Sequence, residues 1–325
     1  MLNYLSKIDQ PGMGRMSEPI HVAMATDRNY LDYALTACAS LLKYTSRDVI
    51  LHLLHEELAQ EDFARFEKLP RNGAFTVLPH RIENAFFEGW PPLRWSISCY
   101  YRLILPELLP ELEKIVYLDC DLLVLDDIGE LYDLDLQDCA CAAVAAKLRP
   151  EHYDRIGLDR KSAYFNSGVM LFAPAKMHRE GHVKRFTALF RELGGRIKYP
   201  DQDILNLAYV NEYVKLPLRW NLTTSVYRNP PEEKLYDEAE TVAALKNPGI
   251  CHFTGKHKPW RFLATTHHPY GFVYPYFAKL AGCPSRLLLK LKLKSCWFTG
   301  ILKKPKLKVP WGPDILKKFP ELRSR

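Results

Sequence analysis

Two aspartates one residue apart could bind a divalent metal. Asp119 and Asp121 follow the apolar run 115–118, and if that run is a strand that ends there, both carboxylates can face one cation. Carboxylate oxygens are the ligands that Mg²⁺ and Mn²⁺ prefer. The pattern alone is not specific, because the chain has two further Asp-x-Asp pairs. A metal site and an ordinary acidic turn both remain open from these residues alone.

A histidine near the end of the chain could complete such a site. His252 lies in the apolar run 249–253, and the loop after it contains Gly255 and Lys258. Two carboxylates and one imidazole suit Mn²⁺, with Mg²⁺ as the alternative, and the lysine could attract an anion. The chain has neither a phosphate-binding P-loop nor a GxGxxG motif, so bound phosphates would need a metal and basic side chains. A purely structural histidine is the other interpretation.

The elements that would position these residues follow an α/β pattern. Runs 20–26, 49–54 and 75–78 have strand composition, and runs 30–44 and 58–69 have helical spacing. The β-α-β-α-β order predicts a mostly parallel central sheet flanked by helices. Further strands are expected at 115–118, 140–146 and 249–253, and helices at 98–109, 176–193 and 201–210. The run 164–172 mixes strand formers with a polar turn.

Ligands bind outside the carboxyl ends of the strands in an open α/β sheet. Asp27 and Asn29 follow the first expected strand, Asp119 and Asp121 follow a later one, and His252 ends the last. These separate segments therefore bring polar residues to one edge of the sheet.

The charge of the chain is concentrated in its last segment. The 325 residues carry a net charge of +7, and residues 284–325 alone carry +10, with 12 Lys or Arg and two acids. The remainder is slightly acidic, which argues against a nucleic-acid-binding body. No run is apolar and long enough to span a bilayer, and the first residues lack the apolar run of a signal peptide. We expect a cytoplasmic protein that lies peripherally on the inner face of the plasma membrane, with its tail on the anionic surface.

Five segments, in order over roughly residues 20–282, resemble those of the family 8 retaining glycosyltransferases. Their pattern is similar to that of the bacterial lipopolysaccharide galactosyltransferases and glucosyltransferases, of the lipo-oligosaccharide α-1,4-galactosyltransferase type. The segments are Tyr100-Tyr101-Arg102, Ile115-Val116-Tyr117-Leu118-Asp119-Cys120-Asp121, Tyr164-Phe165-Asn166-Ser167-Gly168-Val169, Pro200-Asp201-Gln202-Asp203-Ile204-Leu205-Asn206 and His252-Phe253-Thr254-Gly255-Lys256.

The resemblance implies a GT-A nucleotide-diphospho-sugar transferase fold that uses a UDP-sugar and Mn²⁺. By position, Asp119, Asp121 and His252 would bind the metal. The residues expected to bind the donor are Ala25, Asp27, Asn29, Tyr30, Arg102, Asn166, Gly255 and Lys258. The domains would be a flexible leader at 1–18, a GT-A catalytic domain at 19–283 and a basic membrane-association tail at 284–325.

The resemblance also implies the catalytic residues Asp201, Gln202 and Asp203. A retaining transfer needs either a carboxylate nucleophile or front-side attack by the acceptor hydroxyl. Gln202 is a poor nucleophile, so we favour front-side attack and keep Asp203 as the alternative nucleophile. Capping of a helix by Asp201 and Asp203 is compatible with these roles. Core or loop packing is the default for each tryptophan, and Trp260 has the best claim to the acceptor side because it follows the His252 loop.

The expected activity is retaining transfer of galactose or glucose from a UDP-hexose to a lipopolysaccharide, another surface glycan or a lipid-linked glycan. Two other functions stay open. One is a catalytically inactive protein that binds UDP-sugar, and the other is a metal-dependent nucleotide-sugar phosphohydrolase. UDP release that requires an acceptor would separate the transferase from both.

Overall fold

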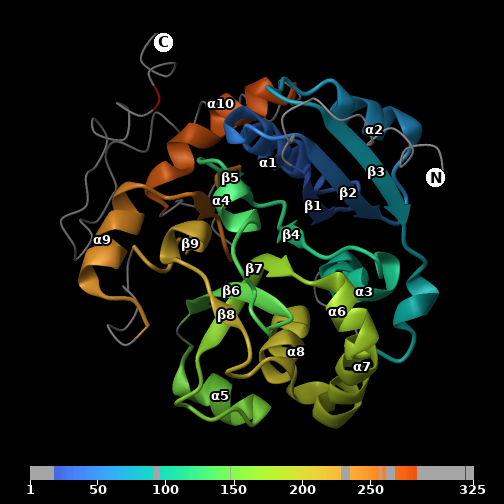
Figure 1. Cartoon of the computed structure of the whole chain (residues 1–325), viewed down its shortest axis with the longest axis vertical. Coiled ribbons are helices and arrows are strands. Elements are labelled where there is room, and N and C mark those ends of the chain that lie inside the picture. The colour runs from blue at the N-terminus through green and yellow to red at the C-terminus, as the bar shows by residue number, and fades with distance from the viewer. Residues whose placement is uncertain are drawn as a thin grey trace, which may run out of the picture.

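The computed structural model describes residues 18–90, 96–146, 148–227, 235–255, 258–260, 268–283 and 319. Figure 1 shows a central sheet with helices packed on its two faces. The predicted α/β class with a mostly parallel central sheet is confirmed.

The main sheet has seven strands in the order β3-β2-β1-β4-β7-β6-β8. The strands are β1 (Ile20–Ala25), β2 (Val49–His55), β3 (Phe75–Arg81), β4 (Ile115–Leu118), β6 (Cys141–Ala146), β7 (Tyr164–Phe172) and β8 (Val214–Lys215). The first four are parallel, while β7 is antiparallel to both β4 and β6. The polar residues that follow β1 and β4 therefore meet at one edge.

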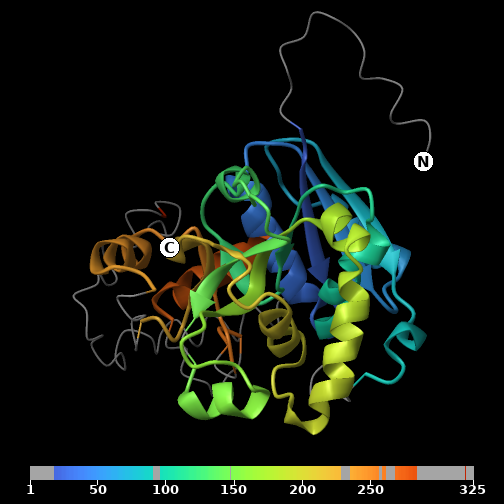
Figure 2. The same cartoon turned by 60° about the horizontal axis from the view of Figure 1, so that its bottom comes forward.

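The central strands β1, β2, β4, β6 and β7 are buried on both faces, which explains their nearly continuous apolar sequences. In β1, Val22 and Met24 join one hydrophobic cluster, and Ala23 and Ala25 join the other. One face is covered by α1 (Leu31–Tyr44), α2 (Gln60–Glu67) and α10 (Tyr274–Leu280). The other face is covered by α3 (Leu105–Leu108), α6 (Pro174–Arg179), α7 (His182–Leu193) and α8 (Pro200–Ala208). Figure 2 shows α7 and α8 side by side on that face.

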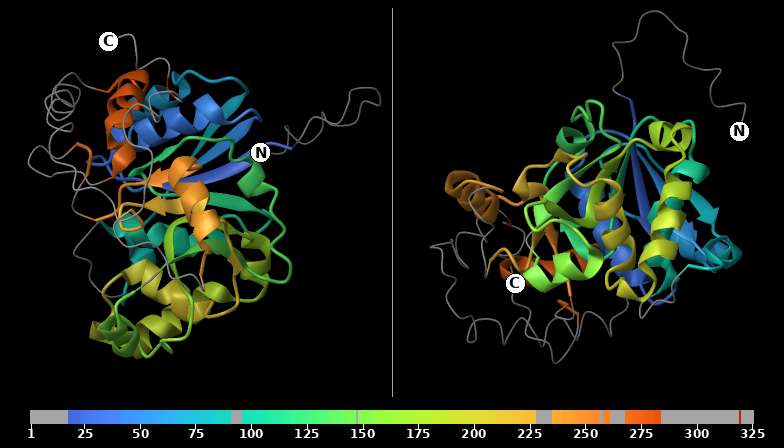
Figure 3. Two further views of the ribbon diagram at one scale, coloured as in Figure 1. Left: turned by 90° about the vertical axis from the view of Figure 1, so that its left-hand side faces the viewer. Right: turned by 90° about the horizontal axis from the view of Figure 1, so that it is seen from below.

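A second, three-stranded sheet brings the late histidine to the aspartates. It has the order β5-β10-β9, with β5 at Leu122–Val124, β9 at Leu222–Thr223 and β10 at Ile250–His252. The antiparallel register pairs His252 with Leu122, the residue directly after Asp121. Figure 3 shows this small sheet between α9 (Glu238–Lys246) and the main sheet.

Three expected elements differ in detail. The helix expected at 98–109 is a 3₁₀ helix, η3 (Ile97–Ile104), followed by the short α-helix α3. Pro106 lies in the first turn of α3, where a backbone N–H would have no partner within the helix and its absence breaks no hydrogen bond. The helix expected at 176–193 is two helices, α6 and α7, separated by Gly181 with φ 70°. Residues 164–172 form one strand rather than a strand with a polar turn, but its pairing with β6 is irregular there, since Ala143 pairs with Met170 and Val144 with Asn166.

The remaining elements are α4 (Gly129–Tyr132), α5 (Pro150–Ile156), η2 (Asn84–Phe87), η4 (Gly194–Arg196), η5 (Leu218–Asn221) and η6 (Pro269–Val273). Within the described ranges, no helix combines the length and the apolar character needed to cross a bilayer.

The predicted leader and tail lie almost entirely outside the described residues. Two residues at their margins are described. The carbonyl of Glu18 accepts a hydrogen bond from Arg47 Nε at 3.0 Å. Phe319 is 2% exposed and belongs to the hydrophobic core on the α1 face. That apolar residue of the expected tail therefore packs into the protein body, and the proposed boundary at 283/284 remains a prediction.

Candidate functional site

The two aspartates and the late histidine converge. Asp119 and Asp121 follow β4, and His252 ends β10. One ligand atom from each lies within 4.8 Å of the others. His252 Nε2 lies 3.0 Å from Asp121 Oδ1 and 3.6 Å from Asp119 Oδ2. Two carboxylates and an imidazole at this separation fit a divalent ion such as Mn²⁺ or Mg²⁺.

Arg102 holds the Asp119 carboxylate in place. It lies on η3, is 4% exposed, and its Nη2 donates to Asp119 Oδ1 at 2.7 Å. Its Nη1 donates to the Ser167 carbonyl at 2.7 Å, and its Nε lies 3.2 Å from Asp201 Oδ2. The guanidinium also lies 4.2 Å from the centre of the Tyr117 ring. One planar fork therefore fixes two carboxylates and a strand carbonyl together, which a lysine could not do.

Lys258 and His252 surround Asp121. The Lys258 ammonium donates to Asp121 and, at 2.7 Å, to the Phe253 carbonyl. Burial alone would raise the pKa of Asp121, but Lys258 and His252 outweigh it and hold that pKa below its usual range. Asp121 is therefore a carboxylate at neutral pH and available as a metal ligand.

Asn166 and Gln202 form the next part of the site. Gln202 lies in the first turn of α8, and its Oε1 accepts from Asn166 Nδ2 at 2.9 Å and from the Ser167 backbone N–H at 3.2 Å. Asp201 precedes it and accepts from Ser167 Oγ at 2.8 Å. Burial raises the pKa of Asp201, and Arg102 opposes that shift. The predicted residues of β7 and α8 thus join the metal cluster through Arg102 and Ser167.

Asp203 occupies a different environment from its two neighbours. Its side chain is 0% exposed. Oδ1 accepts from His152 Nε2 and from Tyr164 OH, both at 2.8 Å, and Oδ2 accepts from the N–H groups of Lys198 and Tyr199, both at 3.0 Å. A carboxylate enclosed by four such donors has no face for attack on a sugar carbon. The geometry does not support Asp203 as the alternative nucleophile.

The residues expected around the nucleotide lie at the carboxyl end of β1. The Ala25 carbonyl accepts from Cys120 Sγ at 3.1 Å, which links this end of β1 to the residue between the two aspartates. Asp27 Oδ1 accepts from the Tyr30 backbone N–H at 3.0 Å, and Asn29 is exposed. Gly255, after β10, has φ +75°, a conformation that favours glycine.

Several residues of the site had no assigned role in the sequence. Gly168 faces Asp119, whose N–H donates to the Gly168 carbonyl at 2.8 Å. An added Cβ on Gly168 would lie 2.2 Å from His252 Cε1 and 2.5 Å from Asp119 Oδ2. A glycine inside a strand indicates such close approach, so its position in the motif was an available clue. Asn221 Oδ1 lies 2.9 Å from His252 Nδ1, and nothing in the sequence around Asn221 indicated this contact.

Trp260 packs in the core, which is the default interpretation of each tryptophan, and not at an acceptor. Its ring stacks on Tyr33 with 4.0 Å between centroids, and the residue is 6% exposed, within the hydrophobic core. It is buried packing rather than an acceptor platform.

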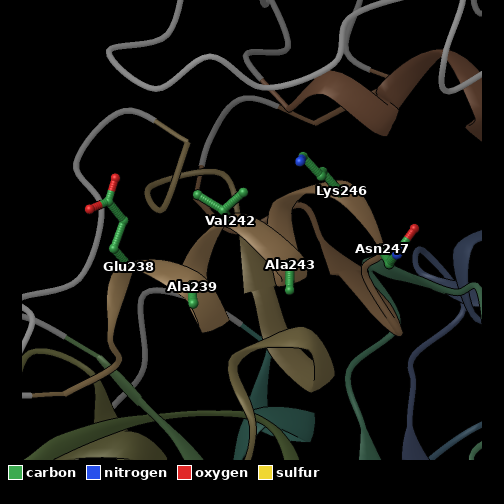
Figure 4. A pocket seen from close by; sticks show the side chains of 6 residues that line it. All are labelled: Glu238, Ala239, Val242, Ala243, Lys246 and Asn247. Carbon is green, nitrogen blue, oxygen red and sulfur yellow. The ribbon is translucent and has the colours of Figure 1, made fainter.

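A hollow of about 670 Å³ lies elsewhere, along α9, and none of its lining residues belongs to this site (Figure 4). They are Glu238, Ala239, Val242, Ala243, Lys246 and Asn247.

The chain belongs to a known enzyme family. The family "Glycosyl transferase family 8" matches residues 21–264, so the protein is a family 8 glycosyltransferase. General stress protein A of Bacillus subtilis is 26% identical over 271 residues, which cover 81% of this chain and 94% of that protein. Lipopolysaccharide 1,2-glucosyltransferase of Escherichia coli is 27% identical over 251 residues, or 75% and 74% of the two chains.

A solved structure agrees with this assignment. The galactosyltransferase LgtC, in complex with donor and acceptor sugar analogues, superimposes with a TM-score of 0.71. It is 26% identical, and the match covers 84% of this chain and 100% of the other. The GT-A fold expected from the five motifs is thereby confirmed.

Proposed function

We propose that this protein transfers a hexose from a UDP-sugar, with retention of configuration, to a lipopolysaccharide or related surface glycan, and that it depends on Mn²⁺. The donor is UDP-galactose or UDP-glucose. The similarity to a galactosyltransferase structure and to a lipopolysaccharide glucosyltransferase supports both the donor class and the acceptor class. We place the reaction in the cytoplasm, on the inner face of the plasma membrane.

One observation carries the proposal. Ligand atoms of Asp119, Asp121 and His252, from β4 and β10, lie within 4.8 Å of one another in a chain of this family. Arg102 and Asn221 connect this cluster to the residues at the start of α8. An ordinary acidic turn lies in solvent, whereas these residues come from two sheets and are held by Arg102, Asn221 and Lys258.

The departure of UDP places negative charge on the diphosphate, and positive charge in the site would stabilise it. A divalent metal held by Asp119, Asp121 and His252 would stabilise that charge as a Lewis acid. Lys258, whose ammonium lies beside Asp121, would add a second positive charge without any proton transfer. Lys258 is held by Asp121 and the Phe253 carbonyl, and a bound metal would be held by three positioned side chains, so little reorganisation would be needed when the charge develops.

Positive charge on the sugar requires a partner on the other side. Gln202 is partly exposed at the start of α8, and its amide is fixed by Asn166 and Ser167. We assign it to stabilise the developing positive charge by its dipole, while the acceptor hydroxyl attacks from the front side. Asp201 and Arg102 would orient the donor sugar. We assign Asp203 to no covalent role.

The basic segment 284–325 supports a partner on the membrane. Its net charge of +10 suits an anionic lipid surface, where each basic residue contributes about 1 kcal/mol. We propose that this segment holds the enzyme near a lipid-linked acceptor, and we propose no nucleic-acid partner.

The proposal is tested by incubating the purified protein with each UDP-hexose, Mn²⁺ and truncated lipopolysaccharides. We expect UDP release that depends on the acceptor, together with an α-linked product by NMR spectroscopy, because the UDP-hexose donors are α-configured. Free hexose released without an acceptor would indicate a phosphohydrolase instead. Binding of UDP-hexose with no turnover under any condition would indicate an inactive sugar-nucleotide-binding protein.

A further inference from the structure

A continuous line of side-chain hydrogen bonds runs from buried Asp203 to the metal-site histidine. Every link is 2.8 to 2.9 Å long. Tyr164 OH donates to Asp203 Oδ1, and Gln202 Nε2 donates to Tyr164 OH. Asn166 Nδ2 then donates to Gln202 Oε1, and Asn221 Nδ2 donates to Asn166 Oδ1. The last link joins Asn221 Oδ1 and His252 Nδ1. The line passes through the residue assigned to the developing positive charge.

The direction of every link is determined by chemistry. An ionised Asp203 can only accept, so the Tyr164 hydroxyl must donate to it and can then accept from Gln202. Two backbone N–H groups, which are donors only, settle the amide orientations independently. Ser167 N–H donates to Gln202 Oε1 at 3.2 Å, and Gly168 N–H donates to Asn166 Oδ1 at 3.1 Å. The oxygens of both amides are thereby identified without reference to the side-chain links.

The same logic determines the histidine. Because Asn221 donates through Nδ2 to Asn166, its Oδ1 is the atom that faces His252 Nδ1. An amide oxygen only accepts, so His252 Nδ1 must carry a proton. That leaves Nε2, 3.0 Å from Asp121 Oδ1, as the nitrogen that faces the metal cluster. Hydrogen bonds of this kind set which nitrogen of a histidine binds a metal.

We propose that Asp203, Tyr164 and Asn221 are positioning residues, which together orient the Gln202 amide and hold His252 with its proton on Nδ1. This inference deepens the proposed function and rests on it for the roles of Gln202 and His252. At one end of the line, the buried Asp203 carboxylate determines which group of each hydrogen bond donates. At the other end, this order places a proton on His252 Nδ1. One network thereby serves both the donor sugar and the metal.

The surroundings of Asp203 support its role as a fixed acceptor. His152 Nε2 donates to it, while His152 Nδ1 lies 2.7 Å from an Arg155 nitrogen, which can only donate. Burial would raise the pKa of Asp203, but His152 and the N–H groups of Lys198 and Tyr199 hold it below the usual range. Asp203 therefore stays ionised, and the direction of the line does not reverse.

The first test separates positioning from simple stabilisation. Tyr164→Phe removes the hydroxyl between Asp203 and Gln202. We expect kcat to fall by about 10- to 100-fold with little change in the KM for the donor. In a Gln202→Ala background the same substitution should change kcat by less than about twofold, because its effect acts through Gln202. An equal loss in both backgrounds would overturn the proposal.

A matched control is available in the same region. The Tyr213 hydroxyl is buried and has no hydrogen-bond partner among the described residues, and its ring packs on Phe165 with 4.7 Å between centroids. Tyr213→Phe deletes the same atom from a neighbouring aromatic ring without breaking the line. We expect it to retain wild-type kcat. A loss equal to that of Tyr164→Phe would attribute both effects to packing and overturn the assignment.

The second test does not use activity, and its measurement is made on the wild-type protein. In metal-free wild-type protein with ¹⁵N-labelled histidine, the His252 ring signals are assigned by their loss in His252→Gln. We expect a proton on Nδ1, whatever the state of Nε2. A bare Nδ1 would overturn the proposal even if the enzyme transfers hexose. A protonated Nδ1 in a protein without transferase activity would instead place the failure in the proposed function.

Discussion

Gly168→Ala should disable the metal cluster by steric displacement alone. The added Cβ would lie 2.2 Å from His252 Cε1, 2.9 Å from His252 Nδ1 and 2.5 Å from Asp119 Oδ2. Carbon atoms pack best at about 3.5–4.0 Å, so the His252 ring would have to move by more than about 1 Å. It cannot move independently, because Asn221 and the β10 backbone hold it.

The expected magnitudes follow from that displacement. Overpacking of a tight interior costs about 1–3 kcal/mol, which for a chain of this size lowers Tm by roughly 2–10 °C. Metal sites tolerate misplacement of only about 0.5 Å, and two of the three ligands would move. We therefore expect the Kd for Mn²⁺ to rise by about 100-fold, equivalent to about 2.7 kcal/mol.

Calorimetric titration of Mn²⁺ into each purified protein measures that affinity, and a melting curve measures stability. Gly195→Ala is the matched control, because a Cβ there meets no described atom within 4 Å and Gly195 has no positive φ. It should match the wild type in both measurements. If Gly168→Ala bound Mn²⁺ with wild-type affinity, the stated contact between Gly168 and the two ligands would not govern the site, and the reasoning would be refuted.

Three further predictions concern stability. Arg102→Lys keeps the positive charge but cannot contact Asp119, the Ser167 carbonyl and Asp201 at the same time. The free energy of unfolding in urea should therefore fall by about 2–3 kcal/mol, and an unchanged unfolding midpoint would contradict this. Gly249→Ala would place a Cβ 2.7 Å from the Trp220 ring, so Tm should fall, and an unchanged Tm would contradict this close contact. Burial lowers the pKa of His52 from 6.5 to about 3, and the nearby His80 and His21 contribute to the same shift. The stability that depends on neutral His52 is therefore complete above pH 6.5 and is lost as the pH falls toward 3. His52→Gln should reduce the slope of unfolding free energy by about 1.4 kcal/mol per pH unit in that window, and an unchanged slope would exclude the assignment.

Local sequence pattern predicted most strands of the sheet and the position of Asp119 and Asp121 at the end of one of them. The run 115–118 is confirmed as β4, and the aspartates that follow it needed only the rule that ligands bind at carboxyl strand ends. The approach of His252 to Asp121 depends on the register of β10 against β5, which is long-range pairing. The positions of the residues at strand ends predicted that His252 and the aspartates share one edge of the sheet, and the resemblance to the family implied their common role.

The rest of the site could not be read from spacing. Gln202 and Asp203 are neighbours in α8, so one helical turn presents them in different directions, one toward the site and one into the core. The enclosure of the Asp203 carboxylate depends on His152 and Tyr164, from α5 and β7. Asn221 lies in a 3₁₀ turn before β9, a segment with no periodicity that would have indicated a role.

The central claim is that Asp119, Asp121 and His252 hold a divalent metal that binds the diphosphate of a UDP-hexose. A thermal-shift titration with UDP, UDP-galactose and UDP-glucose, in Mn²⁺ and in EDTA, tests it most directly. A ligand at a hundredfold excess over its Kd stabilises the folded protein by about 2.7 kcal/mol. We predict that UDP-hexose raises Tm only with Mn²⁺, and that Asp121→Ala abolishes the shift. A shift of equal size in EDTA, or none with any UDP ligand and any metal, would contradict the claim.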